Sequence, residues 1–217
     1  MFIITVFQVA TGERRPNYFV AIQVGSPEIH EALHNVQQTM VDGDTRLREA
    51  MVPIPSLHLT IMVMHLATDD DVDRAKVALI ECNRLLGYRI PEIKRRKLNI
   101  SFQGLGHFNN RVVFAKIRDI DGILDTLDKV AETVKECYKI KGIKSTDTRR
   151  FNPHLTVVKL SRDSVYKTGV RSIRSELYCD HSDTLFGNQP VSGFQLCSMS
   201  KPKSEDGYYY KEHEVLF

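Results

Sequence analysis

The sequence predicts an α+β protein of two pseudo-symmetric lobes whose antiparallel sheets face a central groove. Three observations predict this fold. Segments with the two-residue alternation of strands are separated by segments with helical periodicity. The order strand, helix, strand, helix, strand occurs twice along the 217 residues. A His-Leu-Thr tripeptide recurs at His58 and His154, 96 residues apart. Such a repeat predicts two similar units related by an approximate two-fold axis.

The first half contains three β-forming segments separated by two helical ones. Strands are expected at residues 18–24, 57–66 and 97–102. The first helix follows Ser26, a good N-cap residue, and begins with Pro27, which suits the first helical position. Three aspartates at 69–71 open the second helix, because acidic side chains favour the N-terminal end of the helix dipole.

The second half repeats this order at nearly the same spacing. Strands are expected at residues 111–117, 154–160 and 194–199, and residues 208–216 return as a hairpin arm. A helix is expected at 123–138 and a weaker one at 165–177. We therefore expect an N-terminal extension at 1–15 and one domain at 16–217, with lobe halves of about 16–106 and 107–217.

Composition sets broad limits on function. The content of 42% hydrophobic and 26% charged residues is typical of a globular protein. A net charge of +3 suits an anionic ligand but is weaker than that of a dedicated duplex-binding module. We find no apolar stretch of about eighteen residues and no basic signal-peptide start, so we expect no membrane span and a cytoplasmic location, with the nucleus as the alternative.

The cysteines indicate the redox environment. Cys82, Cys137, Cys179 and Cys197 lie far apart and form no CxxC pair, so we do not expect a zinc site. Their even number permits disulfides. A chain of this length has no need of them, and we expect free thiols in a reducing compartment.

The paired His-Leu-Thr tripeptides are the candidate catalytic residues. Residues i and i+2 of a strand point to the same face, so His58 lies beside Thr60 and His154 beside Thr156. One neutral imidazole can take a proton from an attacking hydroxyl while the other, protonated, gives one to the leaving oxygen. The threonine hydroxyls can hydrogen-bond phosphate oxygens. This equipment is what phosphodiester cleavage needs.

Two alternatives to catalysis apply to these tripeptides. A single copy on an apolar strand is usually structural, but composition predicts on the order of 0.04 such tripeptides by chance, and here two stand at matched positions. Metal binding would favour His, Asp or Glu at the i+2 position. Threonine stands there instead, so we expect no metal.

These motifs and their flanking segments resemble the 2H (two-histidine, LigT-like) phosphoesterase superfamily. The closer likeness is to the phosphoesterase-like central domain found in A-kinase anchoring proteins, and it runs from about Pro16 to near the C-terminus. Besides the histidine motifs, the resembling segments are PNYF (16–19), FQGLGHF (102–108), RRFNPHLT (149–156), LCSM (196–199) and GYY (207–209).

The resemblance implies binding of AMP-like nucleotides and cleavage of 2′-5′ phosphodiester bonds without metal or cofactor. Viral relatives remove 2′-5′-linked signals of innate immunity, and a cyclic dinucleotide with one 2′-5′ bond, such as cGAMP, poses the same chemical task. Attack by the adjacent 3′-hydroxyl would give a 2′,3′-cyclic phosphate. The sequence does not assign the base and the acid. The alternatives are an AMP-type sensing module with little turnover and an RNA-end 2′,3′-cyclic phosphodiesterase.

The expected partner is a nucleotide or a short oligonucleotide bound by a monomer. Anchoring proteins carry an amphipathic kinase-docking helix beyond this domain. The chain ends at Phe217, and residues 211–217 are too short for such a helix, so kinase anchoring is not expected.

Four further residues are candidates for substrate binding. Arg149 can hold a phosphate with its guanidinium fork, and Phe151 can stack on a base. The alternatives are a surface arginine and a phenylalanine at the edge of the core. Phe102 and Tyr18, which lie in resembling segments, are also expected to contact the substrate.

Other features of the sequence have simpler interpretations. Gly104 and Gly106 predict a tight turn, or backbone amides near a phosphate. His107 is expected to be solvated beside them. The basic run at 94–97 predicts a solvated turn, with nuclear targeting or strand tracking as the alternative. Tyrosines 208–210 suit a terminal strand, and one of them can reach the groove.

Overall fold

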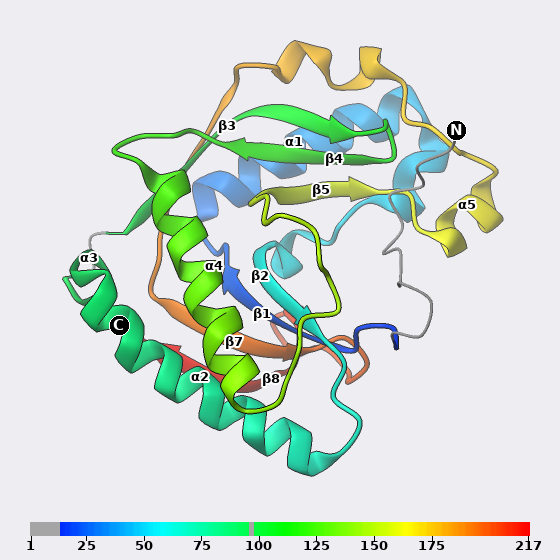
Figure 1. Ribbon diagram of the computed structural model, residues 1–217. Helices are drawn as coiled ribbons and strands as arrows, with labels where there is room; N and C mark the ends of the chain where they lie inside the picture. Colours follow the sequence, from blue (N-terminus) through cyan, green and yellow to red (C-terminus); the bar gives the residue numbers. More distant parts are fainter. Residues whose placement is uncertain (1–13, 96–97) are drawn as a thin grey trace.

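A computed structural model describes residues 14–95 and 98–217 (Figure 1). Within these residues, eight strands form one antiparallel sheet in the order β6-β3-β4-β5-β2-β1-β7-β8. The strands are β1 (Tyr18–Gln23), β2 (His58–Met64), β3 (Asn99–Phe108), β4 (Val112–Ile117), β5 (Leu155–Lys159), β6 (Leu185–Pro190), β7 (Gly193–Ser198) and β8 (Lys211–Leu216). The α+β class is therefore confirmed.

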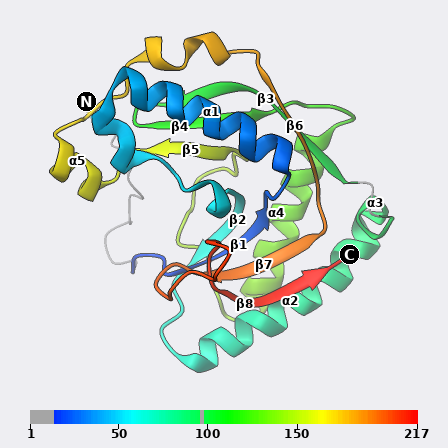
Figure 2. The same ribbon diagram turned by 180° about the vertical axis from the view of Figure 1, so that it is seen from behind.

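The main helices cover opposite sides of the two halves of the sheet. They are α1 (Pro27–Gly43), α2 (Asp69–Arg89), α3 (Pro91–Lys94), α4 (Ile123–Ile140) and α5 (Arg162–Thr168). α1 packs against β5 and β6 on one side, while α2 packs against β7 and β8, and α4 against β2, on the other (Figures 1 and 2). The apolar positions predicted for α1 and α2 are buried, including Leu33, Met40, Leu79 and Leu86. The helices thus seal the core on both sides.

The sheet order confirms the predicted pseudo-symmetry. Read from either end towards the centre, equivalent strands of the repeat occupy equivalent places: β3 matches β7, β4 matches β1, and β5 matches β2. The approximate two-fold axis therefore passes between β2 and β5. The histidine motifs begin or immediately precede these two central strands.

The expected lobe boundary near residue 106 does not separate the halves of the sheet. β3, from the first range, pairs with β4, and β7, from the second range, pairs with β1. Each repeat therefore gives its third strand to the other half. Helices are exchanged too, because α1 packs against β5 and β6 while α4 packs against β2. The two halves are interlocked by these exchanges.

Two local predictions were wrong. Gly104 and Gly106 lie within β3, which continues to Phe108, and do not form a turn. Gly104 has a φ of 73° and sits at a register shift between β3 and its neighbours, so the strand bends there and continues. The helix expected at 165–177 is shorter, because Gly169 ends α5 in the left-handed conformation.

Other segments depart less from expectation. β6 was not predicted, because its sequence, LFGNQP, contains Gly and Pro and lacks a clear alternation. His107 lies on β3 and is exposed. Residues 1–13 of the expected extension and residues 96–97 of the basic run lie outside the described residues; Lys94 ends α3, and Arg95 follows it in a turn. No helix in the described part of the chain is long and apolar enough to cross a bilayer. All four cysteines are free thiols.

Candidate active site

The two histidine motifs meet where β2 and β5 pair. Leu59 lies opposite Leu155 in this antiparallel register, and both side chains are fully buried. One step along, His58 is level with Thr156, and His154 is level with Thr60. Since neighbours in a strand point to opposite faces, these four residues share the face away from the two leucines. We call it the histidine face. Diagonal positions in such a pair are about 7–8 Å apart.

β2 and β5 diverge on either side of this pair, and both bend at matched positions. Ile61 is the extra residue of a bulge against β1, and Val157 is the extra residue of a bulge against β4. These two residues are again 96 apart. A bulge bends its strand and increases the local twist. The repeat therefore includes the distortion that separates the strands beyond the histidines.

The two imidazole rings are oriented in the same way. Nδ1 of His58 lies 2.8 Å from the carbonyl oxygen of Ser56, and Nδ1 of His154 lies 2.7 Å from that of Asn152. A carbonyl oxygen can only accept, so each Nδ1 carries the hydrogen. No described residue hydrogen-bonds the Nε2 atom of either ring. Nε2 is therefore the atom that each histidine presents for proton transfer.

Aromatic rings flank each histidine. The ring of His58 lies 4.7 Å from Phe19 and 5.3 Å from Tyr209, between centroids. The ring of His154 lies 5.0 Å from Phe108 and 5.2 Å from Phe114. These contacts restrict both imidazoles and exclude water from them.

Gly106 makes room for one of these aromatic rings. It pairs with Phe114 across β3 and β4. A side chain at this glycine would meet the Phe114 ring at 2.9 Å, closer than van der Waals contact. The glycine that suggested a turn therefore lets the phenylalanine ring lie over the strand, next to His154.

Burial and nearby cations shift both histidines towards the neutral form. Burial lowers the pKa of His58 to about 4, and the charges of Lys159 and Lys203 act in the same direction. Burial also lowers the pKa of His154, helped by Lys159 and Arg149. The hydrogen bonds from Nδ1 oppose these effects without cancelling them. Both rings are therefore neutral near pH 7 until an anion arrives.

Lys159 is the charged residue that acts on both histidines. It lies opposite Val112 at the end of β5, after the Val157 bulge has shifted the alternation of the strand. This shift turns it to the same face as Thr156. Its side chain is exposed, yet surrounding protein atoms and Arg149 lower the pKa of its ammonium. It supplies positive charge on the histidine face.

Three of the four other predicted binding residues pack into the core. Phe102 is fully buried, so it offers no surface to a substrate. Tyr18 is 8% exposed and packs with the main core, on the opposite face of β1 from Phe19. Phe151 packs against the same core from its edge. The expectation for Phe102 and Tyr18 is corrected by this placement, because strand alternation turns them inward.

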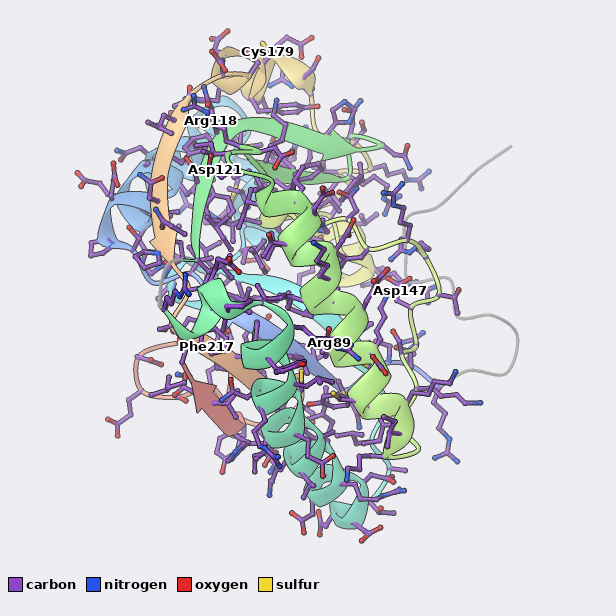
Figure 3. All side chains as sticks on the ribbon, turned by 60° about the vertical axis from the view of Figure 1, so that its left-hand side comes forward. Arg89, Arg118, Asp121, Asp147, Cys179 and Phe217 are labelled. Carbon is purple, nitrogen blue, oxygen red and sulfur yellow. The ribbon has the colours of Figure 1, made fainter. Side chains whose placement is uncertain are left out.

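Arg149 lies near His154, but its guanidinium fork is occupied. Its Nε and Nη2 atoms donate to the two carboxylate oxygens of Asp147, at 2.9 and 2.6 Å. Asp147 lies on the loop between α4 and β5 (Figure 3). The fork that we expected to hold a phosphate thus holds a carboxylate. Arg149 acts on His154 through its charge.

The aromatic residues beside the histidines were not predicted from the sequence. The signal for Phe19 is its strand parity with Ala21, which lies opposite Thr60, and it can be used only once the pairing of β1 with β2 is known. Phe114 lies opposite Thr156, and its position likewise follows from the pairing of β4 with β5. Phe108 and Tyr209 gave no such signal, because their positions depend on the length of β3 and on the loop before β8.

Comparison with known proteins identifies the family. Residues 16–217 match the family described as "AKAP7 2'5' RNA ligase-like domain". The chain belongs to this family. The 2'5' RNA ligase-like domain is a 2H phosphoesterase, a class of enzymes that act on phosphodiester bonds. The resemblance seen in the paired motifs is therefore confirmed.

A curated relative supports the assignment. The chain is 36% identical over 204 residues to human A-kinase anchor protein 7 isoform gamma, and the match covers 93% of this chain and 57% of that protein. The chain thus spans little more than half the length of this relative.

Two solved structures share the fold of this 2'5' RNA ligase-like domain. E. coli LigT complexed with 3′-AMP is 16% identical with a TM-score of 0.58, over 94% of this chain and 98% of that one. The MHV ns2 PDE domain is 13% identical with a TM-score of 0.54, over 86% of this chain and all of that one. At these identities the likeness shows the fold alone.

Proposed function

We propose that this 2H phosphoesterase is a metal-independent phosphodiesterase that cleaves 2′-5′ bonds of signalling nucleotides. The substrate would be a 2′-5′ oligoadenylate or a cyclic dinucleotide with a 2′-5′ bond, such as cGAMP. The supporting observation is the matched presentation of two Nε2 atoms, from His58 and His154, on one face of the sheet. We also propose that the enzyme is a monomer and that it acts in the cytoplasm.

Each residue has a role in the proposed reaction. One neutral histidine takes the proton of the 3′-hydroxyl, whose oxygen attacks the phosphorus of the adjacent 2′-phosphodiester. The bond from phosphorus to the 5′-oxygen breaks, and the other histidine, protonated, gives its proton to that oxygen. The products are a 2′,3′-cyclic phosphate and a free 5′-hydroxyl. Thr60 and Thr156 donate to the non-bridging oxygens, and Lys159 offsets their charge.

The phosphate also supplies the protonated histidine. In the free protein both rings are neutral near pH 7, so neither can serve as acid. A bound phosphodiester places a negative charge between them and raises the pKa of both. Binding of the anion therefore precedes proton uptake in this mechanism. No step requires a metal, and the donors facing the phosphate are imidazoles and hydroxyls.

Two alternatives remain as outcomes of the test. The lowered histidine pKa values favour a module that binds AMP-type nucleotides with little turnover, because such a module needs no protonated ring. The other is an enzyme that opens 2′,3′-cyclic phosphates at RNA ends. Ligands in related structures, 3′-AMP, NADP+ and ATP with E. coli LigT, are consistent with nucleotide binding in all three cases.

The decisive experiment is a substrate panel with a matched inactive protein. Purified protein is incubated with 2′-5′ and 3′-5′ oligoadenylates, 2′,3′-cyclic nucleotides and cyclic dinucleotides, each with and without EDTA. We expect cleavage of the 2′-5′ substrates alone, unchanged by EDTA and absent from His154→Ala. Binding of AMP without turnover would support the sensing module. Loss of activity in EDTA would contradict the metal-free mechanism.

A further inference from the structure

A pocket lined by three arginines lies near the end of β5. It has a volume of about 450 Å³ and opens between α5 and the start of β4. Its lining residues are Arg111, Arg162, Val165, Tyr166, Gly169 and Arg171. Half of them are arginines and none is acidic. The guanidinium group is the side chain best suited to binding phosphate.

These arginines differ from others on the surface of the protein. Arg46, Arg74, Arg89 and Arg149 each form a close ion pair with a carboxylate. Within the described residues, Arg111, Arg162 and Arg171 form no ion pair. Three like charges around one pocket repel one another. An anion bound among them would relieve that repulsion, so the pocket favours a ligand with negative charge.

Tyr166 adds a second binding feature to the pocket. Its side chain is 92% exposed, although a large aromatic ring normally gains by burial. Exposed aromatic rings beside a cationic groove are what single-stranded nucleic acids stack on. The pocket therefore combines groups for a phosphate with a surface for a base.

The pocket is connected to the catalytic pair along β5. His154 immediately precedes this strand, and α5 follows its other end (Figure 1). Five residues at about 3.3 Å each span roughly 17 Å. Lys159 lies between, opposite Val112 in the β4–β5 ladder, and the amide of Leu160 donates to the carbonyl of Arg111 at 2.8 Å. Lys159 therefore adds one positive charge along β5 between the histidine motif and the residues of the pocket.

We propose that this arginine pocket binds the phosphates of nucleotides beyond the scissile bond, so that the enzyme prefers 2′-5′ oligomers to dinucleotides. A substrate with one internucleotide phosphate cannot occupy both sites across this distance. A longer oligomer can place one phosphate between the histidines and another among the arginines. The inference rests on the proposed function for its choice of substrate, while binding at the pocket does not depend on turnover.

The test compares two double variants that each remove two positive charges. Arg162→Ala/Arg171→Ala alters the pocket. Arg118→Ala/Lys129→Ala removes exposed cations elsewhere, and Arg118 lies past the other end of β4 (Figure 3). For the pocket variant we expect kcat/KM on a 2′-5′ tetramer to fall at least about tenfold, because charge-assisted hydrogen bonds to phosphate are removed. Cleavage of the 2′-5′ dimer should stay unchanged in both variants.

A binding measurement separates this inference from the proposed function. In a His154→Ala background, the Kd of a labelled 2′-5′ tetramer is measured by fluorescence anisotropy at several salt concentrations. The pocket variant should weaken binding and reduce the salt slope by about 0.7 for each phosphate that the arginines no longer neutralise. Equal Kd and equal slope in both double variants would overturn the pocket, even if the enzyme cleaves 2′-5′ bonds. If the wild type cleaves no 2′-5′ substrate, the proposed function fails, and the Kd and salt slope of the two double variants still decide whether the pocket binds phosphate.

Discussion

Leu59 and Leu155 lie opposite each other at the centre of the sheet, and each separates the histidine from the threonine of its own motif. Their side chains fill the core on one face, so the His-Thr pairs must point to the other. The backbone pairing of two apolar residues thus brings together four polar ones from distant parts of the chain.

The first prediction concerns the motif residues. His58→Ala and His154→Ala should each lower kcat by about 10²- to 10⁴-fold, since each removes a proton-transfer group. Thr60→Val and Thr156→Val keep the shape of the side chain but remove its hydroxyl, so each should lower kcat by roughly 10²-fold. Single-turnover assays on a 2′-5′ dimer measure these effects, and urea denaturation checks the fold. A His154→Ala protein with wild-type kcat would refute the paired mechanism.

The second prediction is the pH dependence of the reaction. One histidine must be neutral and the other protonated, so kcat/KM should be bell-shaped. Because the pKa of His58 is lowered to about 4 and that of His154 is also lowered, the maximum should lie between about pH 4 and 6.5. Bound phosphate raises both pKa values, so the kcat profile should lie at higher pH. Rates measured at constant ionic strength would test this, and a kcat/KM maximum above pH 8 would contradict it.

The third prediction links His58 to stability. Its pKa is about 4 in the folded protein and near 6.5 in the unfolded chain. Between these values the unfolded chain binds more protons, so this group destabilises the fold as pH falls from 6.5 to 4, by up to about 3 kcal/mol. His58→Gln removes the titrating group, and its free energy of unfolding should fall less over this range. Urea titrations at several pH values measure the difference, with His34→Gln on the exposed side of α1 for comparison. Parallel curves for His58→Gln and wild type would show that burial does not shift this histidine.

The fourth prediction tests the bend in β3. Gly104→Ala should lower the free energy of unfolding by more than about 1 kcal/mol, because the residue has a φ of 73° and its new Cβ would meet the carbonyl of Ser182. Gly25→Ala is the matched control, since a Cβ there meets nothing within 4 Å. Urea denaturation of both proteins gives the comparison. Equal free energies of unfolding for the two variants would show that the bend in β3 does not require a glycine.

Strand parity explains why some site residues were predicted and others were not. The i, i+2 relationship of His58 and Thr60 involves no bulge, so alternation alone placed them together. Lys159 lies beyond the Val157 bulge, where simple alternation from His154 assigns the wrong face. Tyr18 was expected at the site, whereas its neighbour Phe19 lies there, because the face of each residue follows from the pairing of β1 with β2. Each error comes from a backbone register that depends on the neighbouring strand.

The sequence by itself determined the repeat, the order of its strands and helices, and the two His-Thr pairs, because side-chain periodicity is a local property of the chain. The tertiary structure alone decided which strands are neighbours. In the tertiary structure β3 and β7 each pair within the other half of the sheet, and Phe19 and Phe114 lie beside the histidines. The guanidinium group of Arg149 forms an ion pair with Asp147. These relationships depend on the pairing of distant segments and on bulges that reverse the side-chain alternation. They could not be predicted from the sequence because the periodicity of one segment contains no information about its pairing or its bulges.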